Sequence, residues 1–345
     1  MIQRFGGVSR YFVELARALS RAGVPTTVDS PIYVTDALDG LAKDGVSVRG
    51  AHVPVFPGIT WLGHRVARTL SRPGPEGIMH ETWYLEHSSR RKGGRLAVTV
   101  HDTISERFPT EVRGADVQSM RKRKAVDRAD LIFCVSETTR NDAVEYLGIS
   151  PERLVVTPLA PSLPVYPRRK PERPFILYVG HRAGYKNFEL LLRAYQSCPR
   201  LHSDFALICF GGPAFGDDER QMVRRVGNVS HVAGGDQMLA ELYASACVLV
   251  CTSRYEGFGL PLLEAMSAGC PVVAVSGGAT PEVGEAAVRY VHGADPAELS
   301  DTLQTLLYDD VALGDLAERG RTRSGDFSWE QTAALTIEGY KRLAS

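Results

Sequence analysis

Two glutamates eight residues apart, Glu256 and Glu264, could hold the hydroxyl groups of a ligand from two sides. They stand in a glycine-containing segment that follows the apolar, strand-like run 247–252. Pro261 suits the first position of a helix, because its missing N–H would have no partner there in any case. Good helix formers follow, and Gly269 suits the end of that helix. We therefore expect Glu264 in the first helical turn and Glu256 in the loop before it.

The start of this helix is also a potential anion site. The amide groups of Gly259 and Leu260 would lie at the positive end of the helix dipole, and glycine lets an anion approach the backbone closely. Gly257 and Phe258 belong to the same loop and are expected to line the same site. A phosphate beside two carboxylates that accept hydrogen bonds from hydroxyl groups describes a nucleotide-sugar site. For the glutamates alone, a solvated loop and helix turn is the simpler alternative.

A second strand end carries cations. The apolar run 175–179 ends at Gly180 and is followed by His181, Arg182 and Lys186. Fixed cations at this position could neutralise a diphosphate leaving group. A lysine at the start of a helix is mildly unfavourable against the helix dipole, so Lys186 itself indicates a nearby anion.

Weaker candidates follow the elements of the first half. Gly6 and Gly7 precede the helical pattern 8–22, so their amides could meet a phosphate, although a plain turn is the simpler interpretation. His101 follows the strand-like run 96–100 directly before an acid and could act as a hydrogen-bond donor or a base. A histidine satisfied in the core is its alternative. Glu81 and Asp102 are candidates for holding acceptor hydroxyls.

Short apolar runs alternate with helical patterns, which is typical of parallel sheets covered by helices on both faces. In the second half the expected strands are 175–179, 205–210, 229–232, 248–251 and 271–275, and the expected helices lie near 187–197, 217–226, 236–246 and 261–268. In the first half we expect a helix at 8–22 and strands near 96–100, 131–135 and 153–156. Ligands of such sheets bind outside the carboxyl ends of the strands, where the candidate residues stand.

Composition limits the class of protein. The 40 basic and 40 acidic residues balance, so no overall field favours nucleic acid. Basic clusters at 90–92 and 121–124 are expected to be solvated helix faces, with contact to anionic lipid or an acceptor diphosphate as the alternative. No apolar run approaches the ~18 residues of a membrane helix. The six cysteines include no Cys-x-x-Cys pair, which is typical of a protein in a reducing cytosol. The sequence contains no His/Cys cluster with the spacing of metal ligands, so we expect no metal site.

Segment 256–274, EGFGLPLLEAMSAGCPVVA, resembles the hallmark of the retaining glycosyltransferases of family 4. Six further blocks in the family's order extend the resemblance over nearly the whole chain, closest to the branch of bacterial cell-surface polysaccharide mannosyltransferases. They are RFGGVSRYFVELARAL (4–19), HETWY (80–84), VTVHDTISERFP (98–109), CVSETTRND (134–142), VGHRAGYKNFELLLRAY (179–195) and FSWEQTA (327–333).

This resemblance implies the GT-B fold, in which two Rossmann-like, doubly wound domains face each other across a cleft. The implied parts are an acceptor-binding domain (1–160), a proline-rich linker (161–174), a nucleotide-sugar-binding domain (175–326) and a C-terminal helix that returns to the first domain (327–345). Ser328 is the expected N-cap of that helix. A doubly wound domain opens with a strand, and little chain precedes Gly6, so we expect the first strand to be missing, truncated or supplied otherwise.

The resemblance also implies roles for single residues. Glu264 would hold the ribose, Glu256 the donor sugar, and Lys186 the departing diphosphate. In most of the family the arginine directly follows the strand-end glycine, whereas His181 stands there and Arg182 comes next. Which of these two reaches the phosphate stays open. Val232 is assigned to the nucleotide site, and His101 to the catalytic residues.

The implied activity is retaining, metal-independent transfer of a hexose, with no cofactor beside the nucleotide-sugar substrate. Mannose from GDP-mannose is favoured on branch resemblance alone, and a UDP- or other NDP-sugar is the alternative. A saccharide or lipid-linked saccharide would be the acceptor, in the cytoplasm or at the inner face of the membrane. A sugar phosphorylase and a non-catalytic nucleotide-sugar-binding subunit are the alternatives of other classes.

Overall fold

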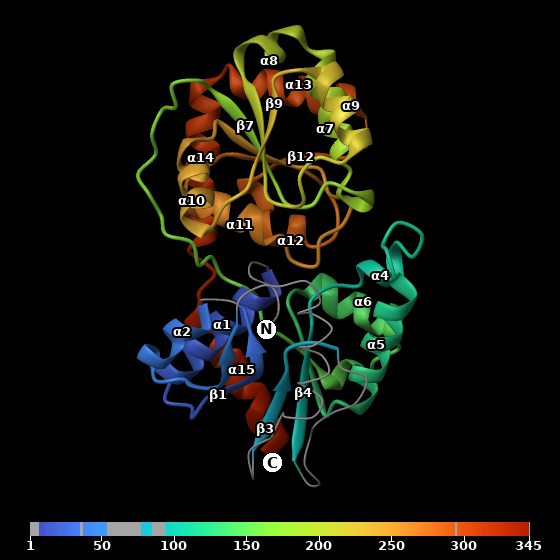
Figure 1. Ribbon diagram of the computed structural model, residues 1–345, viewed down its shortest axis with the longest axis vertical. Coiled ribbons are helices and arrows are strands. Elements are labelled where there is room, and N and C mark those ends of the chain that lie inside the picture. Colours follow the sequence, from blue (N-terminus) through green and yellow to red (C-terminus); the bar gives the residue numbers. More distant parts are fainter. Residues whose placement is uncertain (1–6, 35–36, 54–76, 85–93, 294, 345) are drawn as a thin grey trace. The chain divides into compact units, whose positions relative to one another are not determined.

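The computed structural model describes residues 7–34, 37–53, 77–84, 94–293 and 295–344, and they form two compact units (Figure 1). The first unit contains residues 1–107, 114–159 and 328–345, and the second contains 108–113 and 160–327. Gly6 and the question of a preceding strand lie outside the described residues.

The second unit is a doubly wound α/β domain with a parallel sheet in the order β12-β11-β10-β7-β8-β9. Its strands are β7 (Phe175–Val179), β8 (Ala206–Phe210), β9 (Val229–Val232), β10 (Val248–Cys251), β11 (Val272–Val275) and β12 (Arg289–Val291). Its helices are α7 (Phe188–Ser197), α8 (Pro199–Asp204), α9 (Asp217–Val226), α10 (Asp236–Ser245), α11 (Leu260–Ser267), α12 (Thr280–Gly284), α13 (Pro296–Leu307) and α14 (Asp310–Ser324). Figure 1 shows these helices on both sides of the sheet, which explains why β7, β8, β10 and β11 are apolar along their whole length.

The first unit has a parallel sheet in the order β3-β4-β5-β6 and a separate parallel pair, β1-β2. The strands are β1 (Thr27–Tyr33), β2 (Ser47–His52), β3 (Ile78–Glu81), β4 (Arg95–Val100), β5 (Leu131–Cys134) and β6 (Leu154–Val156). The helices are α1 (Gly7–Arg21), α2 (Ala37–Leu41), α4 (Ile104–Arg107), α5 (Ala115–Arg128), α6 (Glu137–Leu147) and α15 (Trp329–Ala344). The sequence did not predict the β1-β2 pair, whose strands are short of continuous apolar residues.

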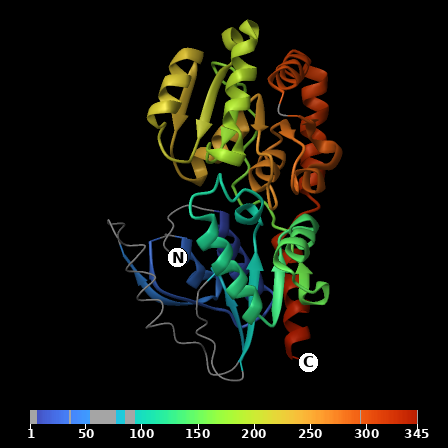
Figure 2. The same cartoon turned by 90° about the vertical axis from the view of Figure 1, so that its right-hand side faces the viewer.

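The C-terminal helix α15 returns to the first unit, as expected, and lies beside its sheet in both views (Figures 1 and 2). Tyr340 and Leu343 pack with Phe133 of β5. A Cβ at Gly339 would come within 2.6 Å of the Phe133 ring, so glycine permits this close approach. The hydroxyl of Ser328 accepts a hydrogen bond from the Gln331 amide at 3.1 Å, which confirms the expected N-cap.

The proline-dense segment expected as a linker is anchored to the second unit near its middle. Arg168 donates to the carbonyl oxygens of Tyr243 and Ala246 at 2.6 and 2.7 Å, at the end of α10. The amide of Arg169 donates to Ala244 at 3.1 Å. Proline removes amide donors, so the cationic side chain supplies part of the attachment that the backbone of this segment cannot.

Candidate functional site

Three neighbouring strands of the second unit, β7, β10 and β11, deliver the loops that carry its candidate residues. Because the strands are parallel and adjacent in the sheet, the loops after Val179, Cys251 and Val275 leave the same edge. Backbone hydrogen bonds then join them. The Arg254 amide donates to the Tyr185 carbonyl, and the Ala279 amide donates to the Glu256 carbonyl, both at 2.9 Å. This edge of the sheet is therefore one continuous set of loops.

Lys186 and Glu256 meet as an ion pair at this edge. Nζ of Lys186 lies 2.6 Å from Oε1 of Glu256, and the two side chains remain 19% and 18% exposed. Burial acts to lower the pKa of Lys186, but the Glu256 carboxylate outweighs it, so the pKa is raised and the lysine is charged at neutral pH. The Thr252 hydroxyl donates to the Lys186 carbonyl at 2.9 Å and holds this loop against the end of β10. The pair can exchange with an incoming anion, because it keeps contact with water.

The helix after Glu256 starts one residue earlier than predicted. Gly259 has φ 97° and caps α11, which begins at Leu260, so Pro261 is its second residue. Glu264 is consequently the fifth residue and opens the second turn, and our placement in the first turn was wrong. Its side chain is only 3% exposed. The helix ladder begins with the amides of Leu262 and Leu263, both of which donate to the Gly259 carbonyl. Pro261 has no N–H, so the amides of Gly259 and Leu260 are the N–H groups that stand ahead of the ladder.

Gly277 and Gly278 pack directly against the backbone of the Glu256 loop. A Cβ at Gly277 would lie 2.2 Å from the Arg254 carbonyl oxygen, and one at Gly278 would lie 2.4 Å from that of Glu256. Gly278 also has φ 56°, which side chains rarely adopt. In the sequence these glycines follow the expected strand 271–275, but their role as the support of the Glu256 backbone appears only in three dimensions. Phe258, by contrast, is buried and packs edge-on against Phe327, so it does not line the site as expected.

Arg182, one of the two candidates for the diphosphate, has its guanidinium engaged by the protein itself. Its guanidinium donates to both carboxylate oxygens of Glu219, at 2.8 and 3.3 Å, to the Gly211 carbonyl at 3.2 Å, and to the Pro213 carbonyl. The side chain is 1% exposed. Arg182 thus holds the glycine turn after β8, while His181 is exposed on the same loop. Gly180 ends β7 with φ 119°, and the Val232 carbonyl accepts from the Gly211 amide at 3.0 Å.

In the first unit, His101 follows β4 directly, as predicted. Its ring makes edge contacts with Tyr11 at 5.2 Å and Phe12 at 5.8 Å, and its amide donates to the Tyr84 hydroxyl at 3.3 Å. Burial lowers the pKa of His101 to about 4, although Asp102 acts in the opposite direction, so the ring is neutral at pH 7. Its Nε2 is buried and lacks a hydrogen-bond partner among the described residues. Gly7 is the first residue of α1.

His80 and Glu81 have structural roles instead of the acceptor role expected for Glu81. Both belong to β3, and the His80 nitrogens bond to Tyr340 of α15 and Thr99 of β4, each at 2.7 Å. Burial lowers the pKa of His80 to about 3. Glu81 is buried and forms an ion pair with Arg128 at 2.6 Å. Because β3 extends to Glu81, both residues belong to the sheet.

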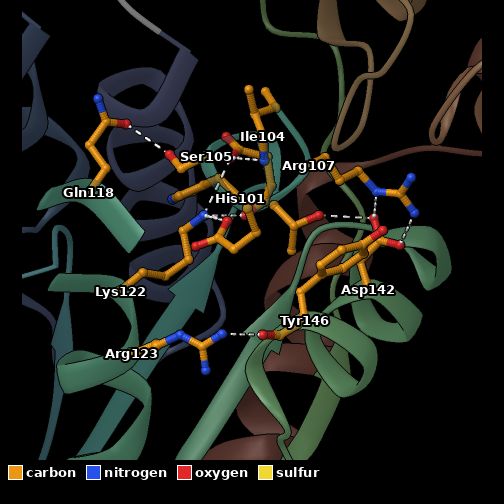
Figure 3. A network of polar contacts seen from close by, with 12 residues as sticks. His101, Ile104, Ser105, Arg107, Gln118, Lys122, Arg123, Asp142 and Tyr146 are labelled. Carbon is orange, nitrogen blue, oxygen red and sulfur yellow. Dashed lines mark hydrogen bonds and ion pairs between the residues drawn. The ribbon is translucent and has the colours of Figure 1, made fainter. Parts of the chain in front are cut away.

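The basic cluster 121–124 is not the uniformly solvated face that we expected. Lys122 is 1% exposed, and its neighbour Arg123 donates to the Tyr146 carbonyl at 2.5 Å (Figure 3).

Among the described residues there is no group of three or more His, Cys, Asp or Glu side chains that could hold a metal ion. In the same part of the chain, no helix is long and apolar enough to cross a membrane.

Comparisons with known proteins show which family the chain resembles. The family model described as Glycosyl transferases group 1 matches residues 165–323, and that described as Glycosyltransferase Family 4 matches residues 5–160. The chain is 33% identical to the O-antigen chain mannosyltransferase B of Escherichia coli, over 76% of this chain and 73% of that protein. It is 32% identical to the MMP alpha-(1->4)-mannosyltransferase of Mycolicibacterium hassiacum, over 83% and 76%.

Solved structures resemble the whole chain. Sucrose-phosphate synthase from Thermosynechococcus elongatus has a TM-score of 0.75 at 20% identity, covering 99% of this chain and 94% of its own. Anabaena HepE, solved in complex with UDP and glucose, has a TM-score of 0.71 at 16% identity, covering 100% and 98%. These likenesses confirm the two-domain GT-B fold.

Proposed function

The chain belongs to glycosyltransferase family 4, and we propose that within this family it is a retaining mannosyltransferase that takes mannose from GDP-mannose. That it is a glycosyltransferase follows from the family match. The observation that supports mannose as the transferred sugar is that two relatives above 30% identity are both mannosyltransferases. A saccharide or lipid-linked saccharide is the proposed acceptor.

The Lys186–Glu256 pair carries the proposal for the chemistry. The diphosphate of the donor displaces Glu256 from Lys186, and the lysine then neutralises the charge that develops as the bond to the sugar breaks. Glu256 turns to the donor sugar. Glu264 serves the ribose hydroxyls, and the amides of Gly259 and Leu260 meet a phosphate oxygen at the start of α11. Gly180 and Val232 border the nucleotide site from the ends of β7 and β9.

The acceptor hydroxyl attacks the anomeric carbon from the face that the nucleotide leaves, and its proton passes to an oxygen of the departing diphosphate. The carbon–oxygen bond to the diphosphate breaks as the new glycosidic bond forms, which retains the configuration. Neutral His101 supplies a hydrogen bond through Nε2 to a hydroxyl group of the reacting sugars. Arg182 is excluded from these roles, because its donors are engaged elsewhere.

No cofactor is proposed, and Lys186 takes the charge-neutralising role that a metal ion has in other enzymes. Full transfer activity in the presence of EDTA is the expected result. Loss of turnover with EDTA and rescue by magnesium or manganese would contradict this part of the proposal.

The deciding experiment compares donors. Calorimetry with GDP and UDP, followed by transfer and hydrolysis assays with GDP-mannose and UDP-glucose, should show preferential binding and turnover of the guanosine compounds. Preference for UDP would replace the donor and keep the enzyme class. Binding of nucleotide sugar without any turnover would favour the non-catalytic subunit, which the intact Lys186–Glu256 pair argues against.

A further inference from the structure

One lysine of the first unit is buried in a run of basic residues. Lys122 is 1% exposed, whereas Arg123 and Lys124 beside it on α5 are exposed. Lysine is almost never buried to this extent unless it is paired, because the ammonium group loses its hydration. The groups that Lys122 contacts therefore indicate the role of this buried charge.

The hydrogen-bond partners of Lys122 lie on the segment that begins at His101. Nζ of Lys122 donates to Oε2 of Glu106 at 2.7 Å and to the carbonyl oxygen of Asp102 at 2.9 Å. The Asp102 carboxylate lies 3.6 Å away, and the Tyr84 ring centroid lies 5.7 Å away. Glu106 is equally enclosed, with its side chain 4% exposed. Figure 3 shows Lys122 reaching from α5 to the segment that starts at His101.

Other bonds hold the same segment further along. The Asp102 carboxylate accepts from the Ile104 amide at 3.0 Å, and the Ser105 hydroxyl donates to Gln118 of α5 at 3.2 Å. Arg107 pairs with Asp142 of α6 at 2.7 Å. Of the α5 and α6 contacts, that of Lys122 with Asp102 is the one closest in the chain to His101.

We propose that Lys122 is a positioning residue of the transfer reaction, which fixes His101 by holding the Asp102 carbonyl and the Glu106 carboxylate. This inference rests on the proposed function, because it is His101 that meets the sugar. The Tyr84 hydroxyl, which accepts from the His101 amide beside the Lys122 ammonium, completes the support. The geometry leaves Lys122 itself without access to a substrate.

Lys122 also acts on His101 through its charge. Its ammonium lowers the pKa of His101, in addition to the larger effect of burial, while Asp102 raises it. The other titratable groups near His101 are Tyr11 of α1, His80 of β3 and Tyr84. A neutral side chain of similar length at position 122 removes the positive charge and keeps most of the packing, so the pKa of His101 should rise.

The test uses Lys122→Met combined with Glu106→Gln, so that no carboxylate is left buried without its cation. Lys124→Met, on the exposed face of the same helix, is the matched control. The His101 ring is followed by NMR as a function of pH, and transfer is measured with GDP-mannose. In the double variant we expect a kcat lower by on the order of 10²-fold, the usual scale of a misplaced reacting group. In Lys122→Met alone, which removes only the positive charge, we expect a higher His101 pKa. The control should match the wild type in both.

An unchanged His101 titration in folded Lys122→Met overturns the inference, because a lysine that only fills space would leave the imidazole unaffected. A full transfer rate in the double variant also overturns it, provided that His101→Gln is slow. The proposed function is tested separately by that His101→Gln protein. If it transfers at the wild-type rate, the catalytic role of His101 fails, and with it the premise of this inference.

Discussion

Each unit contains a lysine–glutamate pair of almost the same length, yet the two pairs serve different purposes. Lys122 and Glu106 of the first unit meet at 2.7 Å with side chains 2% and 4% exposed. Lys186 and Glu256 of the second unit meet at 2.6 Å with side chains 19% and 18% exposed. The two pairs have nearly the same distance between charges, but they differ in how much of each side chain is exposed to water. A closed pair fixes a loop, whereas an open pair can release its carboxylate to admit an anion.

The largest expected effect concerns the stability of the closed pair. Lys122→Met alone should lower the free energy of unfolding by about 3–5 kcal/mol, because it leaves the Glu106 carboxylate buried without a partner. Lys186→Met should change it by about 1 kcal/mol or less, since Glu256 can turn to water. Urea unfolding of both variants measures the difference. Equal losses would show that the two pairs do not differ in the way that we infer.

The next effect is on catalysis at the open pair. Glu256→Gln should reduce kcat by about 10²-fold or more, the scale of one lost electrostatic contact to a developing charge, while binding of GDP alone stays nearly intact. Glu264→Gln should weaken GDP itself, because Glu264 is assigned to the ribose. Transfer kinetics and calorimetry on both proteins give the answer. If Glu256→Gln loses GDP and Glu264→Gln keeps it, the two roles are reversed.

Replacing Lys186 tests whether this lysine binds the diphosphate. Lys186→Ala should weaken GDP binding by about 1.5–3 kcal/mol, as expected for a charge-assisted contact. Arg193→Ala, which breaks the exposed pair with Glu189 on α7, is the control and should bind GDP normally. Calorimetry decides the matter. Unchanged affinity in Lys186→Ala would remove the lysine from the site.

Acid should destabilise the first unit, because protonation of buried His80 favours the unfolded state. Burial holds the pKa of His80 at about 3, below the value near 6.5 of an unfolded chain, so the unfolded state binds the proton first. The stability that neutral His80 supports is complete above pH 6.5 and is lost as pH falls toward 3. At pH 5 the loss should be about 2 kcal/mol. Urea unfolding at pH 7 and pH 5 measures it, and His80→Gln should show a smaller loss; an equal loss would assign it to other groups.

Much of this architecture could be predicted from local sequence. Continuous apolar runs separated by helical patterns gave the strands and helices of the second unit to within about one residue, because a strand covered on both faces must be apolar throughout. The exceptions were α8, β12 and the helices α12, α13 and α14, which were not predicted. Glu256, Lys186 and His101 stand at strand ends in the structure as they do in the sequence. Strands β1 and β2 were missed, because their mixed composition lacks that pattern.

Local sequence thus specifies the order of the elements and the residue types at the strand ends. Which charged side chains are buried in structural contacts depends on packing between distant segments. Arg182 and Lys186 stand four residues apart on one loop, and only packing against Glu219 and Gly211 takes the first away from the ligand. Lys122 gave one hint, since it lies in helical phase with buried Ala115 and Ala125. The partners of Lys122, Asp102 and Glu106, belong to a different segment of the chain. A charge is buried only where such partners are present, and local sequence does not show which segments come together.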